Sequence, residues 1–412
     1  MRILRGQAAE ETVARLAGRA HTVSREERSA RRIIAHVRRE GDHALRNYAR
    51  KWEELGTKPL RVTTAEMRAA SKSVSSELMS SIRLAANNIR RFAERQKPIE
   101  WKRTTNGLTV GQLVRPLESV GCYVPGGRHP LISTLLMTTI PAIVAGVPRI
   151  CVVSPNPPPE LLAVAHELGI GELYRVGGAQ AIAALAYGTE SISRVDKIVG
   201  PGNSYVTAAK RTVAFDCSID MLAGPTEVVI VQHDGEACWI ASDLVAQAEH
   251  DPDALAILIT CSAKLAKAVS ESASKLSQGN AIARESLRKN GYILIAPDRS
   301  QAMAWANRLA PEHITVSEQD VDEVRNAGSI FVGEYSPQAA GDYVSGPNHV
   351  LPTGGAARFR GGLTVHDLVK LITVQQLSPS ALRRVAPAIT ALAEAEGLGA
   401  HANSVRVRCS HA

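Results

Sequence analysis

The first hundred residues carry apolar side chains at helical spacing. These positions recur every three or four residues among charged ones, as in Ile33, Ile34, Val37 and Leu45. That period is typical of amphipathic helices, and the Gly-Asp pair at 41–42 predicts a break between two of them. A turn over 101–107 is then expected to lead into a strand over 108–114.

Beyond residue 148 the pattern changes to short apolar runs separated by helix-length segments. A first series predicts strands within 149–155, 173–178 and 197–202, and a second predicts strands within 227–231, 256–260, 292–297 and 329–333. Repeated strand–helix–strand units with short Gly/Pro turns indicate parallel sheets covered by helices on both faces. The sequence therefore predicts an α/β fold with two doubly wound sheets.

Two other segments are predicted to be apolar helices. The uncharged stretch 130–147 approaches the length of a membrane span, but it contains several Ser and Thr residues and a strand follows it closely. A buried helix packed on a sheet explains this pattern better than a bilayer span. Residues 365–377 are predicted to form an apolar helix, and an Ala-rich helix is expected over 384–398. This tail either folds back on its own body or reaches a neighbouring subunit.

Composition is that of an ordinary soluble protein with a core rich in aliphatic side chains. Of 412 residues, 45% are apolar and 21% charged, while aromatic residues make up only 4%. The net charge of +8 includes an arginine-rich segment near residues 25–39, where acidic residues are interleaved. This favours a solvated helix face over a nucleic-acid-binding arm.

The cysteines and the first residues bear on the expected compartment. The six cysteines are scattered without a C-x-x-C pair, so we expect them to be reduced and structural. The first eleven residues lack the apolar core of a secretory signal. We therefore expect a cytoplasmic protein that binds neither nucleic acid nor membranes.

A candidate metal site begins with Gln247 and His250, three positions apart on a predicted helix. Side chains at this spacing project from one helical face, so an amide oxygen and an imidazole nitrogen can meet one ion. Taken alone, the pair is more typical of an exposed Gln and a satisfied His than of a metal site. Asp342 and His401 would complete a set of two imidazoles and two oxygens with room for substrate. Such a set suits zinc, and also manganese or cobalt.

A candidate proton-transfer site lies at Pro311-Glu312-His313. Imidazole is the usual general base near neutral pH, and a carboxylate can activate water. Neighbouring side chains of a strand point to opposite faces, so we expect a loop here, which Pro311 favours. The alternative is an exposed Glu beside a surface His. His349 could either bond a substrate or cap its own loop.

Glycines follow several predicted strands, at 126–127, 177–178, 200 and 202. Parallel sheets bind ligands at the carboxyl ends of their strands, and glycine permits a close approach of the backbone. However, these glycines do not form the G-x-G-x-x-G fingerprint, and no G-x-x-x-x-G-K-[ST] loop is present. The sequence does not support a conventional dinucleotide or nucleoside-triphosphate site.

Seven motifs, in the same order, resemble the histidinol dehydrogenase family over nearly the whole chain. They are Gly-Cys-Tyr-Val-Pro-Gly-Gly, Gly-Gly-Ala-Gln-Ala-Ile-Ala-Ala-Leu-Ala-Tyr-Gly-Thr, Val-Gly-Pro-Gly-Asn-Ser-Tyr-Val, Ile-Asp-Met-Leu-Ala-Gly-Pro-Thr-Glu, Gln-Ala-Glu-His-Asp, Leu-Ala-Pro-Glu-His and Gly-Pro-Asn-His-Val-Leu-Pro-Thr. The resemblance implies a zinc-dependent enzyme, with one zinc ion per subunit. Such an enzyme oxidises L-histidinol through the aldehyde to L-histidine with two NAD, as the last step of histidine biosynthesis.

The resemblance also implies roles for individual residues. The positions that match the family's zinc ligands are Gln247, His250, Asp342 and His401. The catalytic pair matches Glu312 and His313, and the NAD contacts match Tyr123, Gln180 and Asn203. The positions that match substrate contacts are Thr226, His349 and Glu396, joined by Gln247, His250, His313, Asp342 and His401. Thr226 stands where the family usually has Ser.

The family's fold implies two incomplete Rossmann-like domains with small helical terminal pieces. We expect an N-terminal arm over 1–17 and a large α/β domain, with the metal and catalytic residues, over 18–122 and 228–363. A second, NAD-contacting domain is expected over 123–227, and a helical tail over 364–412. The likeness further implies a homodimer in which the tail completes the partner's site, so that His401 acts across the interface.

Three other functions use some of the same residues. A related NAD-dependent dehydrogenase could act on another small polar alcohol. A zinc hydrolase could use Glu312 as its base without NAD, and a basic binding protein without catalysis would not need zinc.

Overall fold

The computed structural model describes residues 1–19, 24–52, 55, 58–126 and 131–410. The last glycine of the Gly-Cys-Tyr-Val-Pro-Gly-Gly motif and the first residue of the 130–147 segment lie outside these ranges. The chain divides into two compact units, Met1–Gln96 with Glu118–Leu368, and Lys97–Leu117 with Val369–Ala412.

The first unit contains a six-stranded parallel sheet with the order β1-β11-β10-β9-β12-β13. Its strands are β1 (Arg2–Arg5), β9 (Glu227–Val231), β10 (Leu255–Thr260), β11 (Gly291–Ile295), β12 (His313–Val316) and β13 (Ser329–Val332). Three of these strands are buried along their whole length, which explains their nearly continuous apolar sequences.

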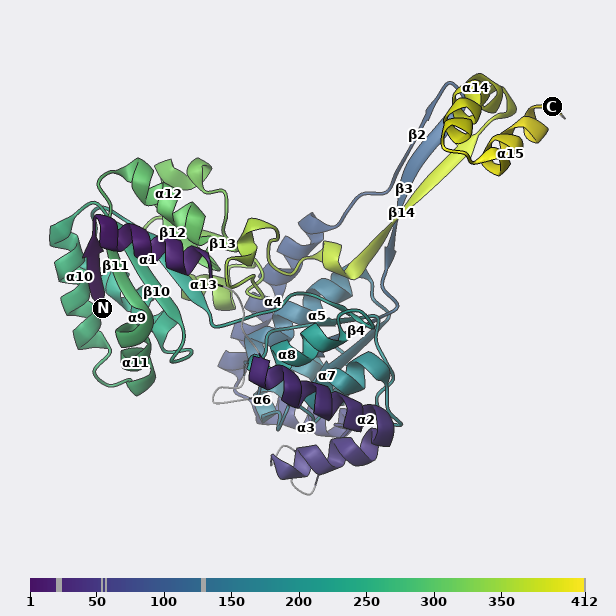
Figure 1. The fold of residues 1–412 in the computed structure, drawn as a ribbon. Helices are drawn as coiled ribbons and strands as arrows, with labels where there is room; N and C mark the ends of the chain where they lie inside the picture. Colours follow the sequence, from purple (N-terminus) through teal and green to yellow (C-terminus); the bar gives the residue numbers. More distant parts are fainter. Residues whose placement is uncertain (20–23, 53–54, 56–57, 127–130, 411–412) are drawn as a thin grey trace. The chain divides into compact units, whose positions relative to one another are not determined.

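Helices cover both faces of this sheet (Figure 1). Alternate residues of its strands pack against different helices. Val229 and Ile257 pack with α1 (Gln7–Ala17) and α12 (Arg299–Leu309). Val228 and Leu258 pack with α9 (Ala237–Ala248), α10 (Ala263–Leu276) and α11 (Ala281–Asn290). The period of two along each strand thus fills two cores, one on each face.

A second parallel sheet, also in the first unit, has the order β6-β5-β4-β7-β8. Its strands are β4 (Ser119–Tyr123), β5 (Arg149–Val153), β6 (Glu172–Tyr174), β7 (Lys197–Val199) and β8 (Ser218–Ile219). The connecting helices are α5 (Ile132–Ala145), α6 (Pro159–Glu167), α7 (Gly178–Tyr187) and α8 (Ser204–Val213). The predicted α/β fold with two parallel, doubly wound sheets is confirmed.

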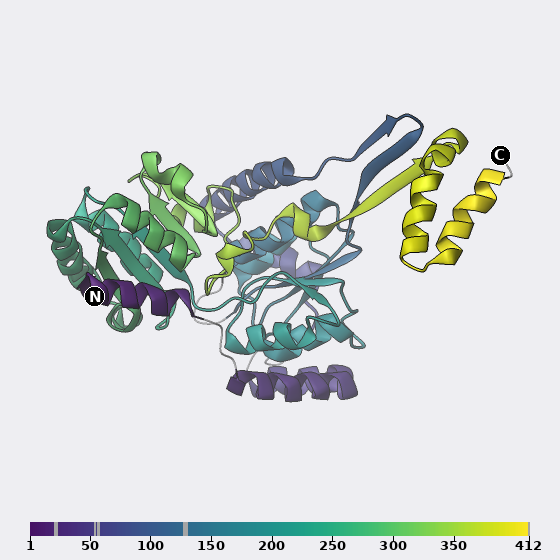
Figure 2. The same ribbon diagram turned by 45° about the horizontal axis from the view of Figure 1, so that its top comes forward.

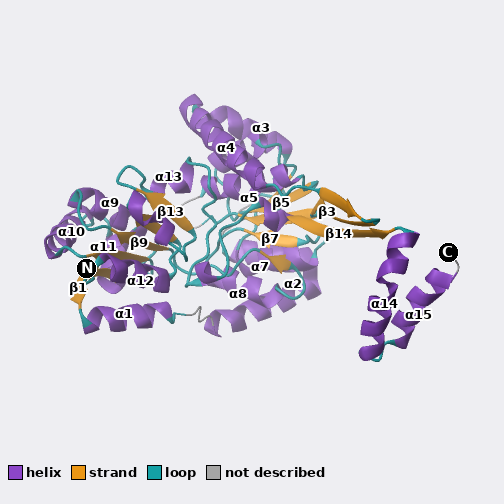
Figure 3. Cartoon of the chain, turned by 90° about the horizontal axis from the view of Figure 1, so that it is seen from above, coloured by secondary structure: helices purple, strands orange, loops and turns teal. Residues whose placement is uncertain are grey.

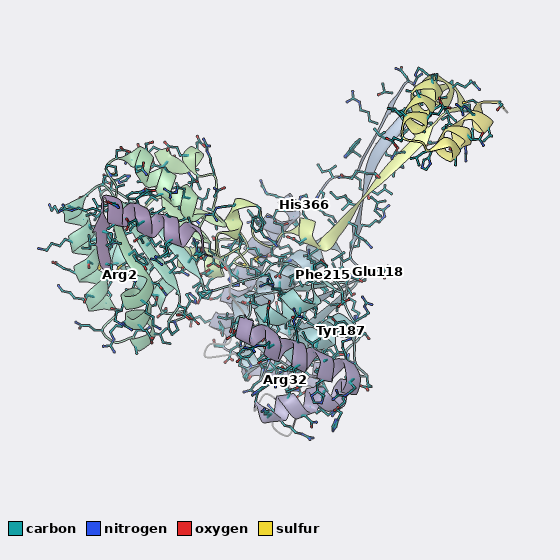
Figure 4. The ribbon with its side chains drawn as sticks, viewed as in Figure 1. Arg2, Arg32, Glu118, Tyr187, Phe215 and His366 are labelled. Carbon is teal, nitrogen blue, oxygen red and sulfur yellow. The ribbon has the colours of Figure 1, made fainter. Side chains whose placement is uncertain are left out.

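The N-terminal helices pack as an outer layer on the helices of this second sheet (Figure 2). α2 (Ser24–Lys51) contacts α7 and α8, while α3 (Thr64–Ser73) contacts α6 and α4 (Ser76–Gln96) contacts α5. Figure 4 labels Tyr187 at the end of α7, where the Arg38 guanidinium of α2 lies 4.3 Å from the ring centroid. Helices α2, α3 and α4 lie within residues 18–122, which we expect to share a domain with the metal ligands. That division into domains stays a prediction.

α2 is kinked where the sequence predicts a break. Gly41 has φ 52° and ψ −131° inside the helix, a conformation that glycine adopts without a steric penalty. A Cβ at this position would meet the Glu190 carboxylate, and the same carboxylate accepts a hydrogen bond of 2.7 Å from the Asp42 amide.

The second unit is an antiparallel sheet followed by two helices, as Figure 3 shows. Its elements are β2 (Trp101–Thr105), β3 (Leu108–Pro116), β14 (Val369–Leu377), α14 (Pro379–Ala395) and α15 (Gly399–Ser410). The predicted turn over 101–107 is wrong for its first five residues, which form β2; the turn itself is Asn106-Gly107, both at positive φ. This pair suits a two-residue hairpin turn.

The prediction of an apolar helix over 365–377 is wrong. A short 3-10 helix at Val365–Leu368 is followed by β14, which pairs with β3 from Val369↔Pro116 to Leu377↔Leu108. The β-branched run Ile-Thr-Val at 372–374 favours a strand, and the long ladder with β3 supplies the hydrogen bonds.

The uncharged segment after residue 130 forms a buried helix, as predicted. Eleven of the fourteen residues of α5 are buried. The hydroxyls of Thr138 and Thr139 donate hydrogen bonds to main-chain oxygens one turn earlier, so their burial leaves no polar group unsatisfied. Among the described residues, no helix is both long and apolar enough to cross a membrane.

Replacing Leu135 of α5 by Ala tests this packing, because Leu135 is fully buried. We expect the free energy of unfolding to fall by about 2–5 kcal/mol, the usual range for a buried Leu→Ala change. Leu84→Ala in α4, where the side chain is 57% exposed, should change it by less than about 0.5 kcal/mol. Urea unfolding followed by circular dichroism makes the comparison; equal effects of the two substitutions would contradict the buried position.

Candidate active site

The candidate catalytic residues gather at the amino ends of two paired strands. Thr226 directly precedes β9, and Glu312 directly precedes β12, which begins at His313. The two strands are parallel neighbours, with His313 opposite Val228. Pairing therefore brings residues 86 positions apart together. This end of the sheet is opposite to the carboxyl end that doubly wound sheets commonly use for ligands.

Glu312 is a buried carboxylate held by two donors. The Thr226 hydroxyl donates to Glu312 Oε2 at 2.5 Å, and the Glu227 amide donates to the same oxygen at 2.9 Å. Burial raises the pKa of Glu312 to about 7, although the nearby His313 and these hydrogen bonds act to lower it. A carboxylate with a pKa near neutrality can both accept and release a proton under physiological conditions.

The expectation that Glu312 and His313 both lie in a loop is only half right. His313 is the first residue of β12, while Glu312 precedes the strand and escapes its alternation of faces. Both side chains therefore reach the same side, with His313 Nδ1 3.7 Å from Glu312 Oε2. Neither side chain is on the surface: the residues are 7% and 4% exposed, which rules out the alternative of an exposed pair.

The hydrogen bonds of His313 fix its tautomer. Nδ1 lies 3.2 Å from the Glu227 carbonyl oxygen, which can only accept, so Nδ1 carries the proton. Nε2 is then the basic nitrogen, and it lies 3.7 Å from Asp342 Oδ1. The phenyl ring of Phe331 packs beside the imidazole, with ring centroids 5.8 Å apart. His313 thus presents an oriented base to the site.

Gln247 is linked to Glu312 through Thr226. The Gln247 amide nitrogen donates to the Thr226 hydroxyl oxygen at 2.5 Å, and that hydroxyl donates onward to Glu312. Because the nitrogen is used in this way, the amide oxygen remains for a ligand. The prediction that His250 shares the helix with Gln247 is wrong in detail: α9 ends at Ala248, and His250 lies two residues beyond it.

Asp342 and His349 approach from the other side of this cluster. Asp342 lies on α13 (Gln338–Tyr343), which contacts α9. His349 Nδ1 donates to the Asp342 carbonyl oxygen at 2.9 Å, and the Thr134 hydroxyl lies 3.2 Å from Nε2. Burial lowers the pKa of His349, opposed by the Asp342 charge and assisted by His313 and His250. These electrostatic effects place the four residues within one local field.

The predicted metal ligands fall in both units. Gln247, His250 and Asp342 belong to the first unit, and His401, on α15, belongs to the second. In the ranges that the structure describes, no group of three or more His, Cys, Asp and Glu side chains is gathered for a metal ion. The donor chemistry still fits zinc, since an amide oxygen aimed by Thr226, an imidazole and a carboxylate come from elements in contact.

Glu396 also belongs to the second unit. It follows α14 as its C-terminal cap, and both Glu396 and His401 are exposed. Neither residue belongs to the compact unit that contains Gln247, His250 and Asp342.

The three predicted NAD contacts surround one point of the second sheet. Tyr123 ends β4, Gln180 lies in the first turn of α7, and Asn203 caps α8 after β7. β4 is the central strand, with β5 and β7 on either side, so the chain changes direction between β4 and β7. Ligands of open α/β sheets bind outside the carboxyl ends at such a point.

Sequence reasoning missed Glu227 and Thr134. Glu227 is 4% exposed; Arg19 donates to its two carboxylate oxygens at 2.8 and 2.5 Å, and the Gly354 amide donates at 2.9 Å. A charged residue at the head of the otherwise apolar Glu-Val-Val-Ile-Val strand was a signal that could have identified it. Thr134 had no such signal, because its partner lies 215 residues away.

Comparisons with known proteins identify the family of this chain. A family model described as histidinol dehydrogenase matches residues 17–409. A histidinol dehydrogenase of Bacillus cereus is 45% identical over 395 residues, covering 93% of this chain and 92% of that protein. One from Methanothermobacter thermautotrophicus is 45% identical over 391 residues, covering 91% and 92%.

A solved structure extends the agreement to three dimensions. The crystal structure of histidinol dehydrogenase from Elizabethkingia anophelis superposes with a TM-score of 0.94 at 35% identity, covering all of this chain and 98% of that one. The resemblance in the seven motifs is thereby confirmed, and the chain belongs to the histidinol dehydrogenase family.

Proposed function

We propose that this protein oxidises L-histidinol through the aldehyde to L-histidine with two NAD and one zinc ion per subunit, as the last step of histidine biosynthesis. The observation that carries the proposal is the Glu312–His313 pair. Two proton-accepting groups with different environments serve one buried site, as an oxidation in two steps requires.

Each half of the reaction uses one member of the pair. In the first half, the neutral Nε2 of His313 takes the proton of the substrate hydroxyl as hydride leaves the same carbon. In the second half, the Glu312 carboxylate takes a proton from water as the water oxygen bonds to the aldehyde carbon. The product of this addition is the anion of the aldehyde hydrate, which loses hydride and one proton to give the carboxylate of the product. Bound NAD would be the hydride acceptor in both halves of the reaction.

Three side chains of the first unit would hold zinc, together with His401. These are Gln247, through its amide oxygen, His250 and Asp342. Bound zinc would supply a Lewis acid that anchors the substrate's nitrogen atoms. Thr226, His349 and Glu396 would complete the substrate contacts, with Thr226 also orienting Gln247 and Glu312.

We propose a homodimer in which the second unit of one chain supplies His401 and Glu396 to its partner. Support comes from the apolar side chains that this unit exposes, among them Ile99, Trp101, Leu371, Ile372 and Leu392. Such exposed apolar surface is typical of a face that another chain covers. The expected compartment is the cytoplasm, consistent with six cysteines that are all free in the described residues.

The proposal is tested by the number of NAD molecules reduced for each histidinol consumed. Purified protein with zinc, NAD and histidinol should form two reduced cofactors for each histidinol consumed. A dehydrogenase of another alcohol would leave histidinol intact but reduce NAD with its own substrate. A zinc hydrolase would never reduce NAD, and either result would remove the proposal.

Replacing the two catalytic residues should affect the halves of the reaction differently. His313→Asn should slow alcohol oxidation by about 10²–10⁴-fold, the usual contribution of a general base. Glu312→Gln should slow oxidation of the supplied aldehyde by a similar factor, because water then lacks its base. Single-turnover absorbance of reduced NAD, started from histidinol or from the aldehyde, separates the halves. Equal losses in both halves for both variants would contradict the division of roles.

The raised pKa of Glu312 predicts a pH profile. Aldehyde oxidation should increase with pH and level off above about 7, since only the ionised carboxylate accepts a proton from water. The stability of the fold has the opposite pH dependence. Between pH 4.5 and about 7, the folded protein keeps a proton on Glu312 that the unfolded chain releases. As the pH rises through this window, the contribution of Glu312 to the free energy of unfolding therefore decreases. Glu312→Gln should remove both dependences, measured by kcat/KM and by urea unfolding.

Metal binding is predicted to depend on Gln247. Gln247→Ala should weaken zinc affinity by at least about tenfold, comparable to losses seen when groups around a metal are removed. Gln278→Ala, the same change at an exposed position of the same unit, is the control. Competition for zinc with a chromophoric chelator measures affinity without relying on turnover. Unchanged affinity in Gln247→Ala would exclude this residue as a ligand.

A further inference from the structure

Lys210 and Asp220 form a buried ion pair that the proposed reaction does not use. Lys210 lies on α8 and Asp220 follows β8, and the residues are 2% and 4% exposed. Two opposite charges removed from water need compensating hydrogen bonds, and those bonds show what the pair holds.

The ion pair forms hydrogen bonds with both the N–H and the C=O of Gly200. Asp220 Oδ2 accepts from the Gly200 amide at 2.7 Å, and Lys210 Nζ donates to the Gly200 carbonyl oxygen at 2.9 Å. Asp220 Oδ1 contacts Lys210 and also accepts from the Met221 amide at 2.5 Å. Both the N–H and the C=O of one residue are therefore fixed by charged partners, which make stronger hydrogen bonds than neutral ones.

Gly200 is held against the end of β4. It has φ +111°, and a Cβ at this position would collide with the Tyr123 carbonyl oxygen. Only glycine allows the loop after β7 to lie this close to β4. The ion pair thus fixes the spacing between the two strands at the point where the sheet changes direction.

The loop over residues 200–203 brings together two of the predicted NAD contacts, since it packs against Tyr123 and ends at Asn203. Tyr123 lies under Gly200, and its hydroxyl accepts from the Gly178 amide at 3.1 Å. Asn203 follows three residues after Gly200, and its side chain accepts from the Tyr205 and Val206 amides at the start of α8. Lys210 lies two helical turns after Asn203, so the helix that Asn203 caps also carries the donor that holds the Gly200 carbonyl oxygen.

We propose that Lys210 and Asp220 are positioning residues that hold the 200–203 loop in the shape that accepts NAD. Net stability is a poor explanation for the pair, because buried ion pairs can often be replaced by apolar residues without loss. Orientation of a loop explains it better, since both charges bind the main chain of one residue, Gly200. The inference rests on the proposed function, in which NAD is the cofactor of the second sheet.

The test replaces the pair by apolar side chains in Lys210→Met/Asp220→Leu. Calorimetric titration with NAD alone should show affinity weakened by at least about tenfold, and hydrogen exchange of the Gly200, Gly202 and Asn203 amides should be faster. At saturating NAD and histidinol, kcat should stay within about threefold while KM for NAD rises. A structural role alone would not produce this separation of KM from kcat.

Two further variants make the result specific. Arg149→Met/Glu172→Leu removes an ion pair at the amino ends of β5 and β6 in the same sheet, and should leave NAD affinity unchanged. Lys210→Gln/Asp220→Asn keeps a donor and an acceptor for Gly200 and should retain most of the affinity. If the apolar variant does not fold, Lys210→Met/Asp220→Asn, which removes the donor to the Gly200 carbonyl and leaves a neutral acceptor for its amide, carries the same comparison.

The outcomes separate the inference from the proposed function. Wild-type NAD affinity in the folded apolar variant, or an equal loss in the Arg149/Glu172 control, overturns the positioning role alone. Failure of the unaltered protein to bind NAD overturns the proposed cofactor, and the positioning role with it.

Discussion

The candidate site depends on the parallel pairing of β9 with β12. Each strand begins with a residue of the site, so their register decides whether Thr226, Glu227 and Glu312 meet. Because both strands are fully buried, a shift of one residue would turn apolar side chains toward the wrong core. The packing of the sheet therefore fixes the geometry of the carboxylate more firmly than a surface loop could.

The electrostatics at this end of the sheet are set by a few neighbouring side chains. Glu227 and Glu312 are both buried, and the charge of Glu227 acts to raise the pKa of Glu312. Arg19 compensates Glu227 through two hydrogen bonds, while Glu312 has only neutral donors and the nearby imidazole. Two carboxylates in adjoining positions thus acquire different characters, one paired with a cation and one available for proton transfer.

Sequence patterns predicted most of the sheet architecture because buried parallel strands are nearly continuous apolar runs. They failed where tertiary pairing decided the structure, as in β14, which an apolar count assigned to a helix. Motifs singled out Glu312, His313 and Gln247 as candidates, and the structure brings these three side chains together. The Thr226 link between Gln247 and Glu312 and the contact of Thr134 with His349 could not be predicted, because they depend on distances across the fold.

The pairing of β1 with β11 has a consequence for how the chain reaches its native state. Residues 2–5 find their partner strand only at 292–295, so nearly three hundred residues must be synthesised before this edge of the sheet can form. The second sheet, whose strands span 119–219, has all its strands much earlier. Such long sequence separation slows folding, and residues 2–5 stay without their partner strand in the nascent chain until residues 292–295 have been made.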